Sequence, residues 1–117
     1  MNGIDRSVLP SYPDWVVIAC SDGALNTAPV GSYRGNGFGL HDMIGNVAEW
    51  VEDCSTTSYA APPPPGTACD RRIVRGGSWG SPIPNLRVAD RFRQPPGHRD
   101  DSIGIRVARP LRRATMR

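Results

Sequence analysis

Lysine is absent from the sequence: all 14 basic residues are arginine. This absence excludes enzymes that form a lysine Schiff base and nucleotide-binding proteins that use a P-loop lysine. The longest purely aliphatic stretch near the N-terminus, residues 16–19, is far shorter than a membrane span of about 20 residues or a signal-peptide core of about 7 to 15. We therefore expect no membrane or export segment in this chain, and its localisation stays unassigned.

Cysteine and histidine are too few and wrongly spaced for a zinc site. The three cysteines are Cys20, Cys54 and Cys69, the two histidines are His41 and His98, and there is no C-x-x-C pair. Cys54 and Cys69 flank a proline-rich loop, so they form a disulfide in an oxidising compartment or remain free thiols in a reducing one. A G-x-S-x-G motif is also missing, which gives no support to a Ser-His-Asp hydrolase.

The composition predicts one modest, loop-rich domain or part of a larger one. Of 117 residues, 13 are glycine and 12 are proline, while 38% are hydrophobic. Residues 1–70 hold two arginines against eight acids, and residues 71–117 hold twelve against three. Because Asp90, Asp100 and Asp101 interrupt the basic half, we expect a lattice of Arg–carboxylate pairs, which argues against a nucleic-acid partner.

Apolar patterning predicts short strands at 15–20, 47–53, 73–75 and 103–108. Over 47–53 both faces are mostly apolar, which is typical of a central strand. Residues 80–102 show no sustained period and read as a long surface loop. We therefore divide the chain into an irregular N-terminal segment (1–14), a domain (15–110) and a basic tail (111–117).

Four segments carry a family resemblance: TAPVGS (27–32), GLHDMIGNVAEW (39–50), RGGSW (75–79) and IGIR (103–106). In order and spacing they resemble the sulfatase-modifying, formylglycine-generating enzyme family. The resemblance runs from about residue 20 to 110 and covers roughly the C-terminal half of the family domain. It implies an α+β fold of the C-type-lectin-like kind. The chain departs from the family at Ala48, where an aromatic residue is usual, and at Ile105, where phenylalanine is frequent.

The resemblance implies chemistry that the residues do not support. Formylglycine-generating enzymes oxidise a substrate cysteine with O₂, and two thiolates shortly after the Gly-Gly-Ser motif hold Cu(I), which prefers soft sulfur ligands. Here the matching positions are Ser81 and Leu86, so copper is not expected. The sequence favours a non-catalytic module that binds a protein or a small molecule. The alternative is a formylglycine-generating oxidase or a fragment of one.

The resemblance also implies a structural Ca²⁺ held by two carboxylates and two backbone carbonyls. The matching residues are Asp42, Gly45, Val47 and Glu49, an oxygen-rich set that suits calcium. In the alternative interpretation no metal binds, Asp42 caps the short turn, and Glu49 pairs with an arginine such as Arg75 or Arg106.

Residues 75–104 further resemble the variable region of diversity-generating-retroelement proteins, in which framework residues alternate with diversified surface positions. This resemblance places a ligand-binding face in residues 80–102. Its candidate contacts are Gly80, Ser81, Asp90, Phe92, Arg93, His98, Asp100, Asp101 and Ser102. Among the aromatic residues, we expect Trp50 and Trp79 in the core and Phe92 exposed as a contact residue. The alternative is that residues 80–102 are a surface loop packed by arginines.

Overall fold

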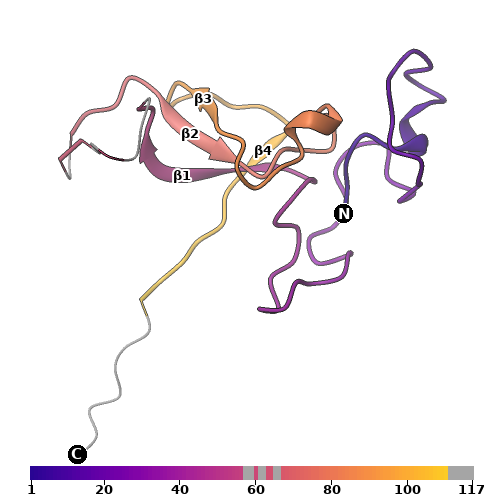
Figure 1. The fold of residues 1–117 in the computed structure, drawn as a ribbon, viewed down its shortest axis with the longest axis horizontal. Coiled ribbons are helices and arrows are strands. Elements are labelled where there is room, and N and C mark those ends of the chain that lie inside the picture. The colour runs from indigo at the N-terminus through magenta and orange to yellow at the C-terminus, as the bar shows by residue number, and fades with distance from the viewer. Residues whose placement is uncertain (57–59, 61–62, 65–66, 111–117) are drawn as a thin grey trace, which may run out of the picture.

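The computed structural model describes residues 1–56, 60, 63–64 and 67–110. Its centre is a four-stranded sheet of order β3-β2-β1-β4 (Figure 1). The strands are β1 (Ala48–Cys54), β2 (Arg72–Arg75), β3 (Phe92–Gln94) and β4 (Ile103–Gly104). Strands β1, β2 and β3 pair antiparallel, whereas β4 runs parallel to β1. Two short 3₁₀ helices, η1 (Arg6–Val8) and η2 (Ile83–Asn85), complete the elements of the described residues.

The prediction of a central strand at 47–53 is confirmed by β1, which has a neighbour on each side. Trp50 pairs with Val74, Val74 pairs with Phe92, and Ala48 pairs with Ile103. Directly paired residues share a face of the sheet, and alternate residues along a strand share it too. These five side chains therefore lie on one face, which we call the Trp50 face. The strand predicted at 73–75 is likewise confirmed by β2.

Three other expectations about the elements are wrong. Residues 15–20 form no strand, because the only bridge there joins Ile18 to Asp5 and no further residues pair alongside. The strand predicted at 103–108 ends at Gly104. Ile105 and Val107 lie beyond its end, 77% and 87% exposed. Residues 80–102, expected to be loop, contain β3 and η2.

The core lies around β2 and the turns that flank β1. Ile73 and Val74 are almost fully buried, and Trp79 is 9% exposed, which confirms the expectation for Trp79. The expectations for the other two aromatic residues are wrong. Trp50 is only half-buried, and Phe92 is half-buried within β3 instead of exposed on a loop.

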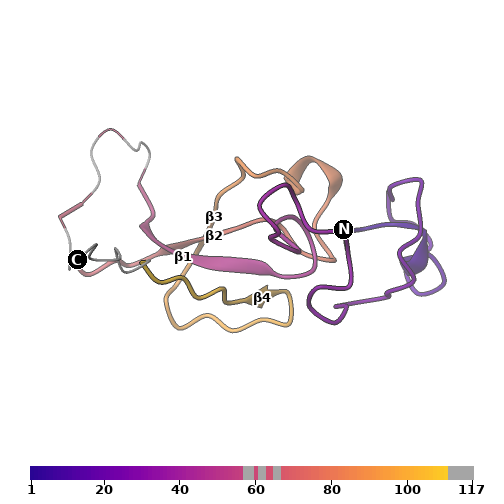
Figure 2. The same cartoon turned by 90° about the horizontal axis from the view of Figure 1, so that it is seen from below.

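Residues 1–26 lie beside the sheet as a separate group of turns (Figure 2). From here on we call these residues the N-terminal segment, in place of the 1–14 expected from the sequence. Its contacts converge on Asn46, which is 3% exposed. The Asn46 backbone N–H donates to the Asn2 backbone carbonyl at 2.6 Å. The Asn46 backbone carbonyl accepts from the Trp79 backbone N–H at 2.9 Å. The Asn46 side chain exchanges two hydrogen bonds with the Ala28 backbone. The neighbouring Gly45 has a φ of 81°, and a Cβ there would collide with the Asn2 carbonyl.

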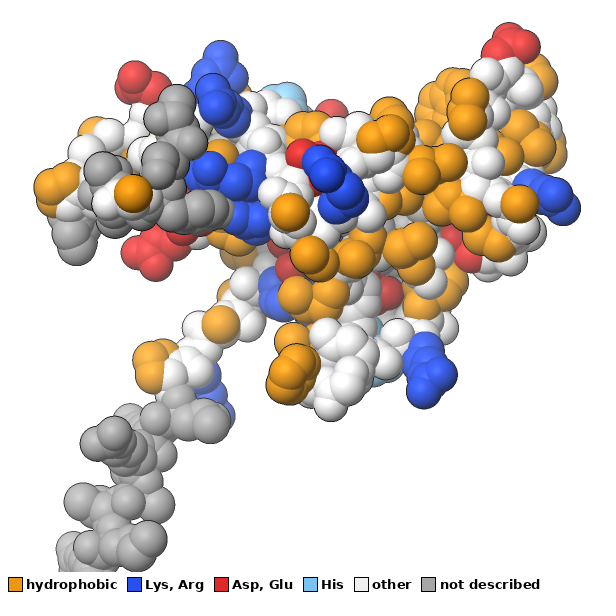
Figure 3. Space-filling model, viewed as in Figure 1, with side chains coloured by type: hydrophobic (Ala, Val, Ile, Leu, Met, Phe, Trp, Pro, Cys, Tyr) orange, Lys and Arg blue, Asp and Glu red, His pale blue; other side chains and the backbone are white. Residues whose placement is uncertain are grey.

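A disulfide joins Cys54 to Cys69, with a Cα–Cα distance of 5.6 Å, and so decides the alternative left open by the sequence. Cys20 is a free, exposed thiol. Among the described helices, none is both long and apolar enough to span a membrane. Figure 3 shows hydrophobic side chains gathered over the N-terminal segment.

The expected lattice of Arg–carboxylate pairs is met at Arg106, which forms an ion pair with Glu49. Three other described guanidinium groups bind backbone oxygens. Arg72 donates to the Glu52 carbonyl. Arg75 donates to Val88 at 3.0 Å and Arg91 to Thr56 at 3.2 Å. These three arginines therefore connect separate segments of the described chain through backbone carbonyl groups.

We expect Gly45→Ala to lower the free energy of unfolding by about 2 kcal/mol or more, because it adds left-handed strain and a clash with Asn2. Gly37→Ala is the matched control, since nothing lies within 4 Å of a Cβ at that position. Urea unfolding measures both. Equal stabilities of the two variants would contradict the role given to Gly45.

Candidate binding face and metal cluster

A cavity of about 130 Å³ opens on the Trp50 face, and we call it the serine cavity. Its polar wall comes from three separate segments and consists of Ser78, Ser81, Gln94 and Ser102. Its apolar wall consists of Ala48, Val74, Phe92 and Ile103. None of these described lining residues is charged. The cavity therefore combines hydrogen-bonding groups with an apolar floor formed by the sheet.

Hydrogen bonds fix three of the four polar side chains. The Ser78 backbone N–H donates to Ser81 Oγ at 2.9 Å, and the two serine hydroxyls are 3.2 Å apart. The Ser102 hydroxyl donates to Asp100, and the Ala48 N–H binds the Ser102 carbonyl at 2.8 Å. The Gln94 carboxamide makes no hydrogen bond with any described residue. Its two N–H donors and its carbonyl oxygen are all available to a ligand.

A second cavity of about 250 Å³, the tryptophan cavity, adjoins the first through Ile103, which lines both. Trp50, His98, Arg99 and Asp100 border it. Hydrogen bonds from the Ser102 hydroxyl and then from its backbone N–H hold the pKa of the Asp100 carboxyl below its usual range. Asp100 is therefore ionised over the physiological range of pH and faces solvent.

Five of the nine predicted contact residues line these cavities. They are Ser81, Phe92 and Ser102 in the serine cavity, and His98 and Asp100 in the tryptophan cavity. The other four, Gly80, Asp90, Arg93 and Asp101, line neither one. Asp90 accepts a hydrogen bond from Asn85 at 2.8 Å. Arg93 is exposed on the opposite face of β3, because it pairs with Ile73.

The sequence interpretation missed Ala48, Trp50, Ser78 and Gln94 as lining residues. Trp50 and Ser78 belong to segments read as framework, and Gln94 shows its place only once β3 pairs with β2. A signal was available at Ala48, where the family resemblance expects an aromatic side chain. The small side chain of Ala48 leaves space where a larger one would lie, and this space is part of the serine cavity.

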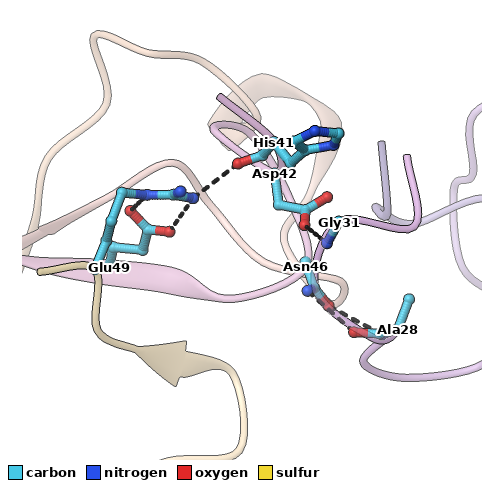
Figure 4. Close-up of polar contacts among 7 residues, drawn as sticks. Ala28, Gly31, His41, Asp42, Asn46 and Glu49 are labelled. Atoms are coloured by element: carbon cyan, nitrogen blue, oxygen red, sulfur yellow. Dashed lines mark hydrogen bonds and ion pairs between the residues drawn. The ribbon is translucent and has the colours of Figure 1, made fainter. Parts of the chain in front are cut away.

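Figure 4 shows two of the predicted calcium ligands, Asp42 in the loop before β1 and Glu49 at the start of β1. Asp42 Oδ2 accepts from the Gly31 N–H at 2.8 Å, while Asp42 Oδ1 is buried without a hydrogen-bond partner. A cavity of about 150 Å³ is bordered by Asp42, Val47 and Glu49. Gly45 is not among the residues that border it, and its N–H binds the Gly76 carbonyl at 2.9 Å. Asp42 thus holds the loop at Gly31 and does not cap its own turn.

Glu49 already has a cationic partner. Both of its oxygens accept from the Arg106 guanidinium, at 2.6 and 2.8 Å, and Arg106 also donates to the His41 carbonyl. The Glu49 carboxylate, first by hydrogen bonding and then by its charge, raises the pKa of Arg106. Of the two arginines considered from the sequence, Arg106 makes the ion pair. Among the described residues, no three or more His, Cys, Asp or Glu side chains gather as a metal-binding group.

Comparison with known proteins identifies the family. Residues 6–111 match the model of the sulfatase-modifying factor enzyme 1-like domain, FGE-sulfatase. The chain belongs to this family. It is 41% identical over 101 residues to the formylglycine-generating enzyme of Streptomyces coelicolor, covering 79% of the chain and 32% of that relative. It is 39% identical over 95 residues to the serine/threonine-protein kinase pkn1 of Chlamydia caviae, covering 74% of the chain and 15% of that protein.

Two solved structures resemble this chain. PvdO from Pseudomonas aeruginosa aligns with a TM-score of 0.65 and 41% identity, over 75% of the chain and 36% of that structure. Treponema denticola variable protein 1 aligns with a TM-score of 0.58 and 29% identity, over 73% and 32%. The chain spans about a third of the length of the formylglycine-generating enzyme and of both structures. The small sheet with few helices agrees with these neighbours, and the C-type-lectin-like classification stays a prediction.

The FGE-sulfatase resemblance gives positions 81 and 86 a special interest, because it places the copper thiolates of family oxidases near them. The structure does bring the two side chains together. A Cβ added to Gly77 would lie 3.0 Å from Leu86 Cδ2 and 3.4 Å from Ser81 Oγ. A hydroxyl and a methyl group do not fit Cu(I), and the nearest thiols in sequence, Cys54 and Cys69, are joined to each other. The residues present therefore do not form a copper site.

We expect the Asp100 carboxyl to titrate below its ordinary value of 3.8. The hydrogen bonds stabilise the carboxylate, so their contribution is present above the ordinary pKa and is lost as the pH falls through the lowered one. Ser102→Ala should move the midpoint partway back toward 3.8 in an NMR titration, whereas Ser81→Ala should leave it unchanged. A wild-type midpoint at or above 3.8 would refute this.

Proposed function

We propose that this chain is a non-catalytic binding module of the FGE-sulfatase family, with a ligand face formed by the serine and tryptophan cavities. The observation that carries the proposal is the pairing of Ser81 with Leu86 at the point where family oxidases place two thiolates. The fold preserves the convergence of the two positions, and the sequence replaces both sulfur donors. Of the two residues, Ser81 borders the serine cavity, which has neutral polar walls.

The arrangement of the face suits recognition. Strands β1 and β2, with the buried Ile73 and Val74, form a rigid base. The segments that carry Ser81, His98 and Asp100 are irregular loops on that base. Binding residues are often found on loops held by a rigid scaffold, because loop side chains can change without loss of the core. The ligand we propose is a protein or a small molecule.

The relatives support a use beyond oxidation, and also the alternative. One structural neighbour is named a variable protein and one sequence relative a protein kinase, so the family domain occurs in proteins of different names. The likeness to Treponema variable protein 1 supports a further proposal, that the cavity-lining positions in 80–102 are diversified. Against this, 41% identity to a formylglycine-generating enzyme favours the oxidase. The choice between them is a matter of copper chemistry and can be tested directly.

We expect no formylglycine from the wild-type protein when it is incubated with Cu(I), O₂ and a Cys-x-Pro-x-Arg peptide and the peptide is analysed by mass spectrometry. Ser81→Cys combined with Leu86→Cys should gain tight Cu(I) binding, because two thiolates would then converge beside Gly77. The matched control is Ser81→Cys with Val88→Cys, which places the second thiol on an exposed residue. Formylglycine at enzyme-like turnover from the wild type would overturn the binding-module proposal.

We also propose a structural Ca²⁺ at the Asp42–Glu49 cavity. The buried Asp42 Oδ1, which lacks a hydrogen-bond partner, is the observation that favours it, because a buried carboxylate oxygen is costly when it is unsatisfied. The donors that border the cavity are the carboxylates of Asp42 and Glu49 and the backbone carbonyl of Val47. The Gly45 carbonyl, which the family resemblance also implies as a ligand, lies outside the cavity lining. Glu49 would exchange Arg106 for the ion. Its role would be to fix the loop at Gly31 against the start of β1.

Calcium should therefore raise the melting temperature of the wild-type protein, and a chelator should reverse the rise. At a calcium concentration 100-fold above Kd the stabilisation is about 2.7 kcal/mol. Asp42→Asn and Glu49→Gln should abolish the response, and Asp14→Asn, an exposed acid in the N-terminal segment, should retain it. A wild-type protein indifferent to both calcium and chelator has no such site.

A further inference from the structure

The serine cavity admits only a small chemical group. Its volume is about 130 Å³, whereas pockets for drug-sized ligands measure roughly 300 to 1,000 Å³. An engineered cavity of roughly 150 Å³ accepts benzene, so the serine cavity has room for about five non-hydrogen atoms. A ligand of this size is a side-chain head group or a small organic molecule.

The group that enters must be uncharged. The described residues that line the cavity are all neutral, although the chain carries 14 arginines and 11 acids. An ion placed there would lose its hydration with no opposite charge to replace it. Asp100, which receives the Ser102 hydroxyl hydrogen, borders the neighbouring tryptophan cavity instead.

The polar wall offers both donors and acceptors. Ser102 gives its only hydrogen to Asp100 and so presents acceptor lone pairs. Ser78 and Ser81 are 3.2 Å apart, so one hydroxyl donates to the other and the second keeps a free O–H. The Gln94 carboxamide has no partner among the described residues and offers two N–H donors and a carbonyl oxygen. A matching ligand must donate and accept at the same time.

We propose that the serine cavity binds a primary carboxamide on a short aliphatic chain, as on a glutamine or asparagine side chain or a free aliphatic amide. The inference rests on the proposed binding function. The ligand carboxamide pairs with that of Gln94 by two reciprocal N–H···O bonds, and its second N–H reaches the Ser102 oxygen. Its alkyl part lies against Val74 and Phe92.

Ala48 is the residue that keeps the cavity open. It lies in the apolar wall and is 6% exposed, so a larger side chain at 48 would project into the space. Ala48→Trp, which introduces the type of residue expected from the family resemblance, therefore fills the cavity. It removes the space without removing Ser78, Ser81, Gln94 or Ser102.

The test is a titration of the full chain, labelled with ¹⁵N, with propionamide, followed through the Gln94 side-chain NH₂ signal. The loss of that signal in Gln94→Leu assigns it. We expect saturable shifts with a millimolar Kd. Methyl acetate has the same number of non-hydrogen atoms but no donor, and propionate and propylammonium are charged. All three should bind at least tenfold more weakly.

The variants separate the cavity from general surface effects. Ala48→Trp, followed through the Gln94 NH₂ signal, should weaken propionamide binding at least tenfold. Gln94→Leu, followed through the backbone amide signal of Ser102, which also lines the cavity, should weaken it equally. Arg93→Gln, next to Gln94 but on the other face of β3, should leave it unchanged. Dispersed amide spectra show that each variant is folded. If Ala48→Trp is not folded, Gln94→Leu and Ser81→Ala replace it, and both should weaken propionamide binding.

The carboxamide proposal is overturned if methyl acetate or propionate binds as tightly as propionamide, if no saturable shift occurs, or if the folded cavity variants bind like the wild type. Failure of the binding-module function would look different. Formylglycine from the Cys-x-Pro-x-Arg peptide would remove that function even where propionamide binds. A protein inert toward the peptide that also ignores propionamide would lose only the carboxamide proposal.

Discussion

The hydrogen bonds of Asn46 hold the N-terminal turns against the loops around the sheet, and the path of the chain into β1, which borders both candidate sites, depends on them. One buried side chain and its backbone connect Asn2 and Ala28 on one side with Trp79 on the other. Asn46 also has a positive φ of 64°, which asparagine tolerates better than most residues. It therefore sets the direction in which the chain enters β1 two residues later.

That geometry places two different sites on opposite sides of one short motif. Asp42 and Glu49 flank Asn46 in sequence and border the 150 Å³ cavity. Ala48, the first residue of β1, faces the other way and borders the serine cavity. The alternation of a β-strand is sufficient to explain this division, since Ala48 and Glu49 are consecutive residues. A change in the 42–49 segment would consequently affect both sites.

The sequence predicts the parts of the fold that local patterning controls. Residues 47–53 have apolar side chains on both faces, so their central position in the sheet could be inferred. The three residues of β3 are too few to show alternation, and they become a strand only by pairing with β2. The aliphatic run at 15–20 has strand propensity, but it has no partner strand, so the propensity has no effect.

The sites show the same division between local and long-range information. The family motif indicated Asp42 and Glu49, but the choice of Arg106 as partner depends on a contact 57 residues away in sequence. The serine cavity is less predictable still, because Ser78, Gln94 and Ser102 come from three separate segments. Only the folded chain brings their side chains to one place, and the absence of charge there cannot be read from a sequence rich in arginine.

The Cys54–Cys69 disulfide has a consequence for how the protein can change. It closes the chain on itself at the end of β1, about 20 Å along the strand from Ala48 at 3.3 Å per residue. Extra residues between these two cysteines would lengthen the loop that the disulfide closes. The strands lie outside this loop and would stay in place. Lengthening such a loop costs little entropy, about 0.6 kcal/mol for each doubling. An epitope, a fluorophore or a second domain inserted there would leave ligand recognition intact.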